Sequence, residues 1–406
     1  MKRIYTFVVL TLAIFGVRSL AVAQNGANAL APGERRDFKV EFNKPAVFDV
    51  RLKENGFAAF SWTTEEARSW LSYSITNSAG GQEQRGDASY VHAAYFVAPK
   101  ADTYSIKFFI DPKADDKQPQ TVSLSLSDQF KVPANATVKD KRKAAGYDIE
   151  LVTIPGSDDE AGATFATVKK GGLLKNILYG DIESPVMGFS FADASDDDEG
   201  VSAQGKKSLA LIKNTADKTG DGVPDVMLSY YSGGAHCCTT YYFIELPANG
   251  TGAIREVPTE NAGMSAIGKA PGGGLRFATA DNAWAYWNMS FAGSPMPDVI
   301  LEFRDGVARP NFDLMKKRAP SLAVLTRKAA AARKKISNAP YTSDSGDFQF
   351  DEAFWSEMID LMYTGHEDLA WKYFDMVWPK AKPGKDKFVA DFTETLANSY
   401  YADKTK

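Results

Sequence analysis

Short runs of alternating hydrophobic and polar side chains dominate the first third of the chain. Their period of about two residues is that of a β-strand with one buried face, and they occupy Phe38–Phe42, Ala46–Leu52, Ala93–Ala98, Tyr104–Ile110 and Thr121–Ser127. Gly, Pro and Asp separate the runs, as turns require. Regularly spaced short strands without a long helical pattern predict an antiparallel β-sandwich over residues 24–130.

The pattern changes twice further along the chain. Residues 131–146 are polar, charged and contain proline, so we expect a linker there. A second β-rich domain is expected over residues 147–310. In residues 311–406 the apolar side chains follow the helical period, and we predict helical hairpins there; one stripe consists of Leu322, Leu325, Ala329, Ala332 and Ile336. The predicted fold is therefore mainly β with an α-helical C-terminal region.

The first 23 residues have the composition of a secretory signal peptide. Lys2 and Arg3 precede an apolar run of 14 residues, Ile4–Val17, and Ala21 to Ala23 offer small residues for cleavage before Gln24. The run is shorter than the roughly 20 residues that span a bilayer, so we expect cleavage and no remaining membrane span. No Cys lies near the cleavage site, so a lipoprotein is not expected. The predicted location is the periplasm or the cell exterior.

Composition and charge narrow the possible partners. The 406 residues include 47 Lys and Arg, 51 Asp and Glu, three His and two Cys. Loss of the predicted signal would remove three basic residues and leave a net charge of −7, which argues against nucleic acid as a partner. Export would place the chain where disulfides persist and calcium is abundant.

The most specific motif is DKTGDGVPD, from Asp217 to Asp225. Calcium takes six to eight oxygen ligands, so a tight loop must direct several oxygens inward, and Gly220 and Gly222 permit such a turn. The alternate positions offer side-chain oxygens and one backbone carbonyl, and we expect a structural Ca²⁺ site at Asp217, Thr219, Asp221, Val223 and Asp225. An ordinary Asp-Gly turn without metal is the alternative. An EF-hand is excluded because Leu228 stands at the twelfth position.

The 30 residues from Asp217 to Leu246 resemble known families. The loop, followed by a strand, a turn and a second strand, resembles the calcium loops of FG-GAP and VCBS β-propeller repeats. This resemblance implies Asp217, Asp221 and Asp225 as carboxylate ligands, the carbonyl of Val223 as a further ligand, and a partial-propeller-like central domain. Thr219 stands where those families more often have Asn or Asp, and the chain has one clear copy of the motif. With its SGGAHCC segment, the run also resembles uncharacterised exported bacterial proteins.

The N-terminal region has a resemblance of its own. Pro32-Gly33-Glu34 precedes the first strand, and APKADTYSIKFF stands near the end of the strand-rich region. This order resembles the small jelly-roll domains of the bacterial prepeptidase C-terminal type. The resemblance covers about a quarter of the chain and implies a β-sandwich.

The two cysteines, Cys237 and Cys238, are adjacent and follow His236. In an oxidising compartment neighbouring thiols can close a vicinal disulfide, which is the pairing we expect because no other Cys is present. Buried free thiols, or a soft-metal or redox site that includes His236, remain alternatives.

These features predict an exported, non-enzymatic calcium-binding structural or binding module of the bacterial envelope. Its partner would be a protein or polysaccharide of the envelope. One alternative is a hydrolase of an envelope polymer that uses carboxylates of the central domain, and a pocket with a buried carboxyl of raised pKa would favour it. Another is a protein-docking platform built from the C-terminal helices. No catalytic residue and no organic cofactor site is predicted.

Overall fold

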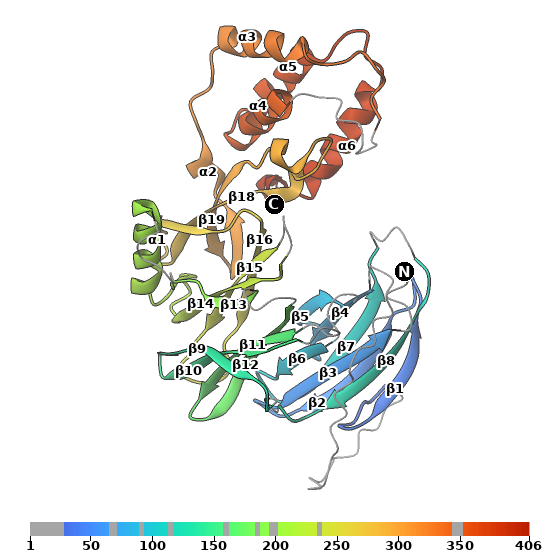
Figure 1. Cartoon of the computed structure of the whole chain (residues 1–406), viewed down its shortest axis with the longest axis vertical. Helices are drawn as coiled ribbons and strands as arrows, with labels where there is room; N and C mark the ends of the chain where they lie inside the picture. The colour runs from blue at the N-terminus through green and yellow to red at the C-terminus, as the bar shows by residue number, and fades with distance from the viewer. Residues whose placement is uncertain are drawn as a thin grey trace. The chain divides into compact units, whose positions relative to one another are not determined.

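The computed structural model describes residues 28–64, 71–88, 93–112, 117–130, 132, 134–156, 162–182, 187–194, 202–233, 238–342 and 352–405 (Figure 1). Among the residues that the structure describes, 42% lie in strands and 22% in helices, with five antiparallel sheets and helices in the C-terminal region, which confirms the predicted fold class. It divides into two compact units. The first contains Met1–Ser190 and Glu245–Ala253, and the second contains Phe191–Ile244 and Ile254–Lys406.

Two four-stranded sheets of the first unit form the predicted sandwich. One has the order β1 (Arg35–Val40), β8 (Gln120–Ser127), β3 (Phe57–Thr64), β6 (Ala93–Val97). The other has the order β2 (Ala46–Leu52), β7 (Asp102–Ile110), β4 (Leu71–Thr76), β5 (Gln82–Asp87). Both sheets contribute to one buried core, in which the rings of Trp62 and Phe108 meet edge to face at 5.2 Å. Alternate side chains of β7 and β8 are buried, as the sequence period predicts.

The third sheet of this unit corrects the expected linker. Its order is β12 (Leu173–Ile182), β11 (Gly162–Lys170), β10 (Tyr147–Ile154), β9 (Thr137–Ala144). Strand β9 lies inside the range 131–146 and pairs with β10 through a turn at Ala145 and Gly146, both of which have positive φ. Most of its side chains are exposed at the sheet edge, so β9 has no apolar face that a sequence pattern would reveal.

The second unit contains most of two further sheets. Their orders are β13 (Gly188–Phe191), β14 (Asp225–Tyr231), β15 (Thr239–Glu245), β16 (Ile254–Glu260), and β17 (Ser265–Lys269), β18 (Leu275–Ala280), β19 (Asp298–Arg304), β20 (Val307–Pro310). Phe243 of β15 is fully buried between Phe277 of β18 and Phe303 of β19, with ring centroids 5.3 and 4.8 Å away. Helix α1 (Ala203–Asn214) precedes β14 and begins at Ser202, whose hydroxyl accepts a hydrogen bond from the Gly205 amide.

The C-terminal helices share a core with these sheets. They are α2 (Phe312–Met315), α3 (Leu322–Arg333), α4 (Glu352–Tyr363), α5 (Glu367–Val377) and α6 (Lys385–Ala397), followed by the 3₁₀ helix η3 (Tyr400–Thr405). Gly365, with φ of 88°, lies in the turn between α4 and α5. Trp284, from the 3₁₀ helix η1 (Asn282–Trp284) after β18, is fully buried and packs on Phe392 of α6 at 4.8 Å.

One buried carboxylate joins the helices to the sheet. Asp281, at the end of β18, is 3% exposed. Its Oδ2 accepts hydrogen bonds from the Tyr363 hydroxyl at 2.6 Å and the Tyr400 amide at 2.7 Å, and Oδ1 accepts one from the Ala283 amide at 2.9 Å. Burial raises the pKa of this carboxyl above its usual value, although the hydrogen bonds oppose the shift.

This raised pKa predicts a pH dependence that Asp281→Asn will remove. In the unfolded chain the carboxyl titrates near pH 4, while the folded chain binds the proton more tightly. The contribution of Asp281 to the free energy of unfolding is therefore fully present below about pH 4 and falls as pH rises through the raised folded pKa. Urea unfolding from pH 4 to 8 should show wild type losing stability relative to Asp281→Asn. A difference that stays constant or grows with pH contradicts this, and Asp305→Asn, in an exposed turn, is the control.

Candidate functional site

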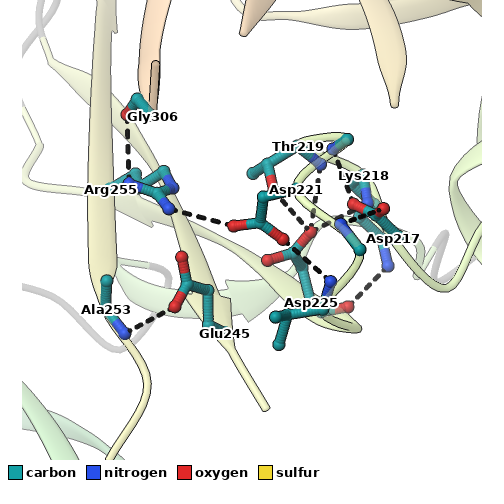
Figure 2. Close-up of polar contacts among 12 residues, drawn as sticks. Asp217, Lys218, Thr219, Asp221, Asp225, Glu245, Ala253, Arg255 and Gly306 are labelled. Atoms are coloured by element: carbon teal, nitrogen blue, oxygen red, sulfur yellow. Dashed lines mark hydrogen bonds and ion pairs between the residues drawn. The ribbon is translucent and has the colours of Figure 1, made fainter. Parts of the chain in front are cut away.

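The predicted calcium loop connects α1 to β14, and it is organised around the carboxylate of Asp225. Asp225 is the first residue of β14 and is 4% exposed. Its Oδ2 accepts hydrogen bonds from the amides of Lys218 and Thr219 at 2.8 and 3.0 Å, and from the Thr219 hydroxyl at 3.2 Å (Figure 2). Asp225, at the end of the loop, is thus hydrogen-bonded to Lys218 and Thr219 near its beginning.

The other two carboxylates of the loop also accept backbone amides. Asp217 accepts the Gly220 amide at 2.6 Å through Oδ1 and the Gly222 amide at 2.8 Å through Oδ2. Asp221 accepts the Val223 amide at 2.9 Å, and its Oδ2 forms an ion pair with Arg255 Nη2 at 3.0 Å. These contacts fix the curvature of the loop.

One carboxylate oxygen of this network accepts no hydrogen bond from the residues that the structure describes. Asp225 Oδ1 is buried and has no hydrogen-bond partner among the described residues. Desolvation raises the pKa of Asp225 to about 6, and the neighbouring charge of Asp221 adds to the shift, while the Thr219 and Lys218 amides oppose it. Burial of a carboxylate with an unsatisfied oxygen is unfavourable unless a proton or a cation compensates it.

Lys218 supplies a buried cation beneath the loop. Its side chain donates from Nζ to the backbone carbonyls of Thr215 at 3.0 Å and Asp225 at 2.7 Å. Burial lowers the pKa of this ammonium, and the charges of Asp225, Asp193 and Asp217 oppose that shift. The Lys218 ammonium is hydrogen-bonded to these two backbone carbonyls and not to Asp225 Oδ1, which has no partner among the described residues.

A second backbone turn packs directly against the loop. The Leu275 amide donates to the Lys218 carbonyl at 2.8 Å. Gly220, with φ of +85°, and Gly274 approach so closely that a Cβ on Gly274 would lie 2.7 Å from the Gly220 nitrogen. The glycines at these two positions allow the β17–β18 turn to contact the loop.

The fit of the loop to a calcium ion is partial. Its oxygens are the hard donors that calcium prefers, the unsatisfied Asp225 Oδ1 suits a cation, and Asp221 lies near enough for its charge to raise the pKa of Asp225. Among the residues that the structure describes, no group of three or more His, Cys, Asp or Glu side chains is arranged to hold a metal ion. The chemistry of the donors therefore fits calcium, while their present hydrogen bonds direct them to amides and to Arg255.

A groove in the same unit contains carboxylates that belong to no recognisable sequence motif. It has a volume of about 560 Å³, and its lining includes Glu256, Glu260, Asp281, Tyr400 and Asp403. Glu256 and Glu260 of β16 are exposed, yet the groove walls reduce their solvation and raise the pKa of each carboxyl, with Asp281 adding to the shift of Glu260. The lining residues come from β16, from the end of β18 and from η3, so no sequence motif identifies them as one site.

Comparison with known proteins identifies no family. No family model matches the chain, and no curated protein matches it. A quarter of the chain has a weak structural resemblance to a pre-peptidase C-terminal domain.

That domain belongs to a collagenase of Bacillus anthracis, with 15% identity over 25% of this chain and 93% of that chain and a TM-score of 0.21. PliG of Aeromonas hydrophila, a periplasmic inhibitor of g-type lysozyme, is 9% identical over 25% of this chain and 96% of its own, with a TM-score of 0.20. A β-glucuronidase of Ruminococcus gnavus is 7% identical over 82% of this chain and 60% of its own, with a TM-score of 0.13. None of these likenesses assigns a function to this chain.

Several predicted features fall outside the described residues. The signal peptide, residues 1–23, is one of them, and His236 and Cys237 are others, so the vicinal disulfide of Cys237 and Cys238 stays a prediction. Cys238 itself precedes β15, and its carbonyl accepts the Ser232 amide at 3.1 Å. No helix in the described part of the chain has the length and apolar character needed to cross a membrane.

Because Gly274 is in close contact with Gly220, alanine at position 274 should destabilise the fold much more than alanine at the nearby position 272. Gly274→Ala should lower the free energy of unfolding by about 1–3 kcal/mol, because its Cβ would collide with the backbone of the loop. Gly272→Ala is the matched control, since a Cβ there meets nothing within 4 Å, and its effect should stay within about 0.5 kcal/mol. Urea unfolding measures both, and equal effects would show that the close approach is unimportant.

Proposed function

We propose that this protein is an exported, non-enzymatic binding or structural module of the bacterial envelope whose loop Asp217–Asp225 binds a structural calcium ion. The observation that carries the proposal is the buried Asp225 Oδ1, which has no hydrogen-bond partner among the described residues. Asp225 is the last of the five alternate oxygen positions, and the resemblance to FG-GAP and VCBS loops assigns it a ligand role. The partner would be a protein or polysaccharide of the envelope.

The ion would be held by the carboxylates of Asp217, Asp221 and Asp225, the Thr219 hydroxyl and the Val223 carbonyl. When bound, it would supply positive charge beside a carboxylate that burial has desolvated. The residues themselves already shape the loop through backbone amides. The role of the metal is therefore to stabilise a turn that the chain has largely formed, which suits a structural ion better than a catalytic one.

Calorimetric melting of the mature protein in EDTA and in millimolar calcium tests this proposal. Calcium at about 100 times its dissociation constant should stabilise the folded state by about 2.7 kcal/mol and raise the melting temperature by a few degrees. Asp225→Asn keeps an oxygen that can accept the Lys218 and Thr219 amides, but it removes the buried charge, so the calcium response should vanish.

The control is Asp305→Asn, in the exposed turn after β19, which should respond to calcium as wild type does. If the melting temperature of wild type is the same in EDTA and in calcium, the proposal is contradicted. A calcium response retained in Asp225→Asn would place the ion elsewhere.

A second candidate function is hydrolysis of an envelope polymer in the groove beside β16. The observation that favours it is the raised pKa of the Glu260 carboxyl in a cavity of about 560 Å³. One feature weighs against it. Both oxygens of Asp281 are held by hydrogen bonds.

Incubation with purified peptidoglycan sacculi and measurement of released reducing ends decides this alternative. A hydrolase would release ends in proportion to time, and Glu260→Gln would lower the rate at least about 100-fold, as loss of a general acid does. Glu41→Gln, remote in sequence and in the first unit, controls for loss of a surface charge. No release by wild type would exclude peptidoglycan hydrolysis.

A further inference from the structure

Arg255 links the candidate loop to another turn of the same unit. It is the second residue of β16, and its guanidinium donates from Nη2 to Asp221 Oδ2 at 3.0 Å and from Nη1 to the Gly306 carbonyl at 3.2 Å (Figure 2). The Arg255 and Asp221 side chains are 21% and 30% exposed. The pair is therefore partly shielded from solvent, where charge interactions are stronger than at an open surface.

The turn that receives Arg255 is shaped to admit it. Gly306, with φ of +75°, follows Asp305 in the β19–β20 turn, and a Cβ on Gly306 would collide with the guanidinium. Glycine there serves two purposes: it adopts the left-handed backbone, and it leaves room for the arginine. The guanidinium position is thus defined from both sides, by a carboxylate and by a carbonyl.

Asp221 is also one of the carboxylates expected to hold calcium. An ion bound to Asp221 would lie about 2.3–2.6 Å from its oxygen, while the guanidinium nitrogen lies 3.0 Å from Oδ2. A divalent ion and a guanidinium on one carboxylate repel each other, and the repulsion is largest where solvent is partly excluded. Arg255 therefore opposes calcium at Asp221 and, in the absence of the ion, neutralises the same charge.

We propose that Arg255 is an internal counter-cation that competes with calcium for Asp221 and so sets the affinity of the loop. This inference rests on the proposed calcium site and adds a residue that lies outside the motif, 30 positions after Asp225. Calcium binding then includes displacement of the guanidinium from Asp221, and removal of the arginine charge makes the loop bind calcium more tightly.

Titration of calcium into metal-free protein, followed by isothermal calorimetry, measures the effect. Arg255→Gln removes the charge and should lower the dissociation constant about tenfold or more, whereas Arg255→Lys keeps a cation and should stay within about threefold of wild type. Arg304→Gln is the matched control, because Arg304 pairs with Glu302 on β19 instead of with the loop. Arg255→Met is a second neutral variant in case Arg255→Gln fails to fold.

Each outcome separates this inference from the proposed function. Tighter binding by the neutral variants, with Arg255→Lys and Arg304→Gln unchanged, supports the competition. Equal affinity of wild type and the neutral variants overturns it and leaves the calcium site standing. Binding by the neutral variants alone supports the competition and contradicts calcium binding by wild type. Binding by none of the proteins overturns both.

Discussion

The buried carboxylate of Asp225 is the constraint on which the rest of the candidate site depends. Two backbone amides and a hydroxyl converge on one of its oxygens, and this convergence forces residues 218–225 into a closed loop. The closed loop in turn presents the Lys218 carbonyl to Leu275 and brings Gly220 against Gly274. Position 225 therefore controls the turn and its contact with the β17–β18 turn.

Acidic groups outnumber the cations described around this carboxylate. Lys218 lies beneath the loop and bonds to backbone carbonyls, while Arg255 lies beside it and pairs with Asp221. These two cations lie near four acidic groups, which are Asp193, Asp217, Asp221 and Asp225. An additional cation is consistent with the unsatisfied Asp225 Oδ1.

The sequence predicts those parts of the fold that depend on local periodicity. Alternation identified strands β7 and β8, because each buries one face, and the apolar stripe over α3 follows the helical period. Strand β9 was missed because its side chains are mostly exposed. The loop could be predicted as one unit since its oxygen-bearing residues are close in sequence. The roles of Arg255, Gly274 and Gly306 could not be predicted from the sequence. Each of these residues contacts its partner only once the sheets have formed.

Diffraction from crystals of residues 24–406 grown in millimolar calcium, recorded near the calcium absorption edge, shows directly whether the loop Asp217–Asp225 binds the ion. We expect one anomalous peak about 2.3–2.6 Å from Asp225 Oδ1, with the Arg255 guanidinium moved away from Asp221. An ordered loop without an anomalous peak, in which Arg255 remains paired with Asp221, would contradict calcium binding by the loop.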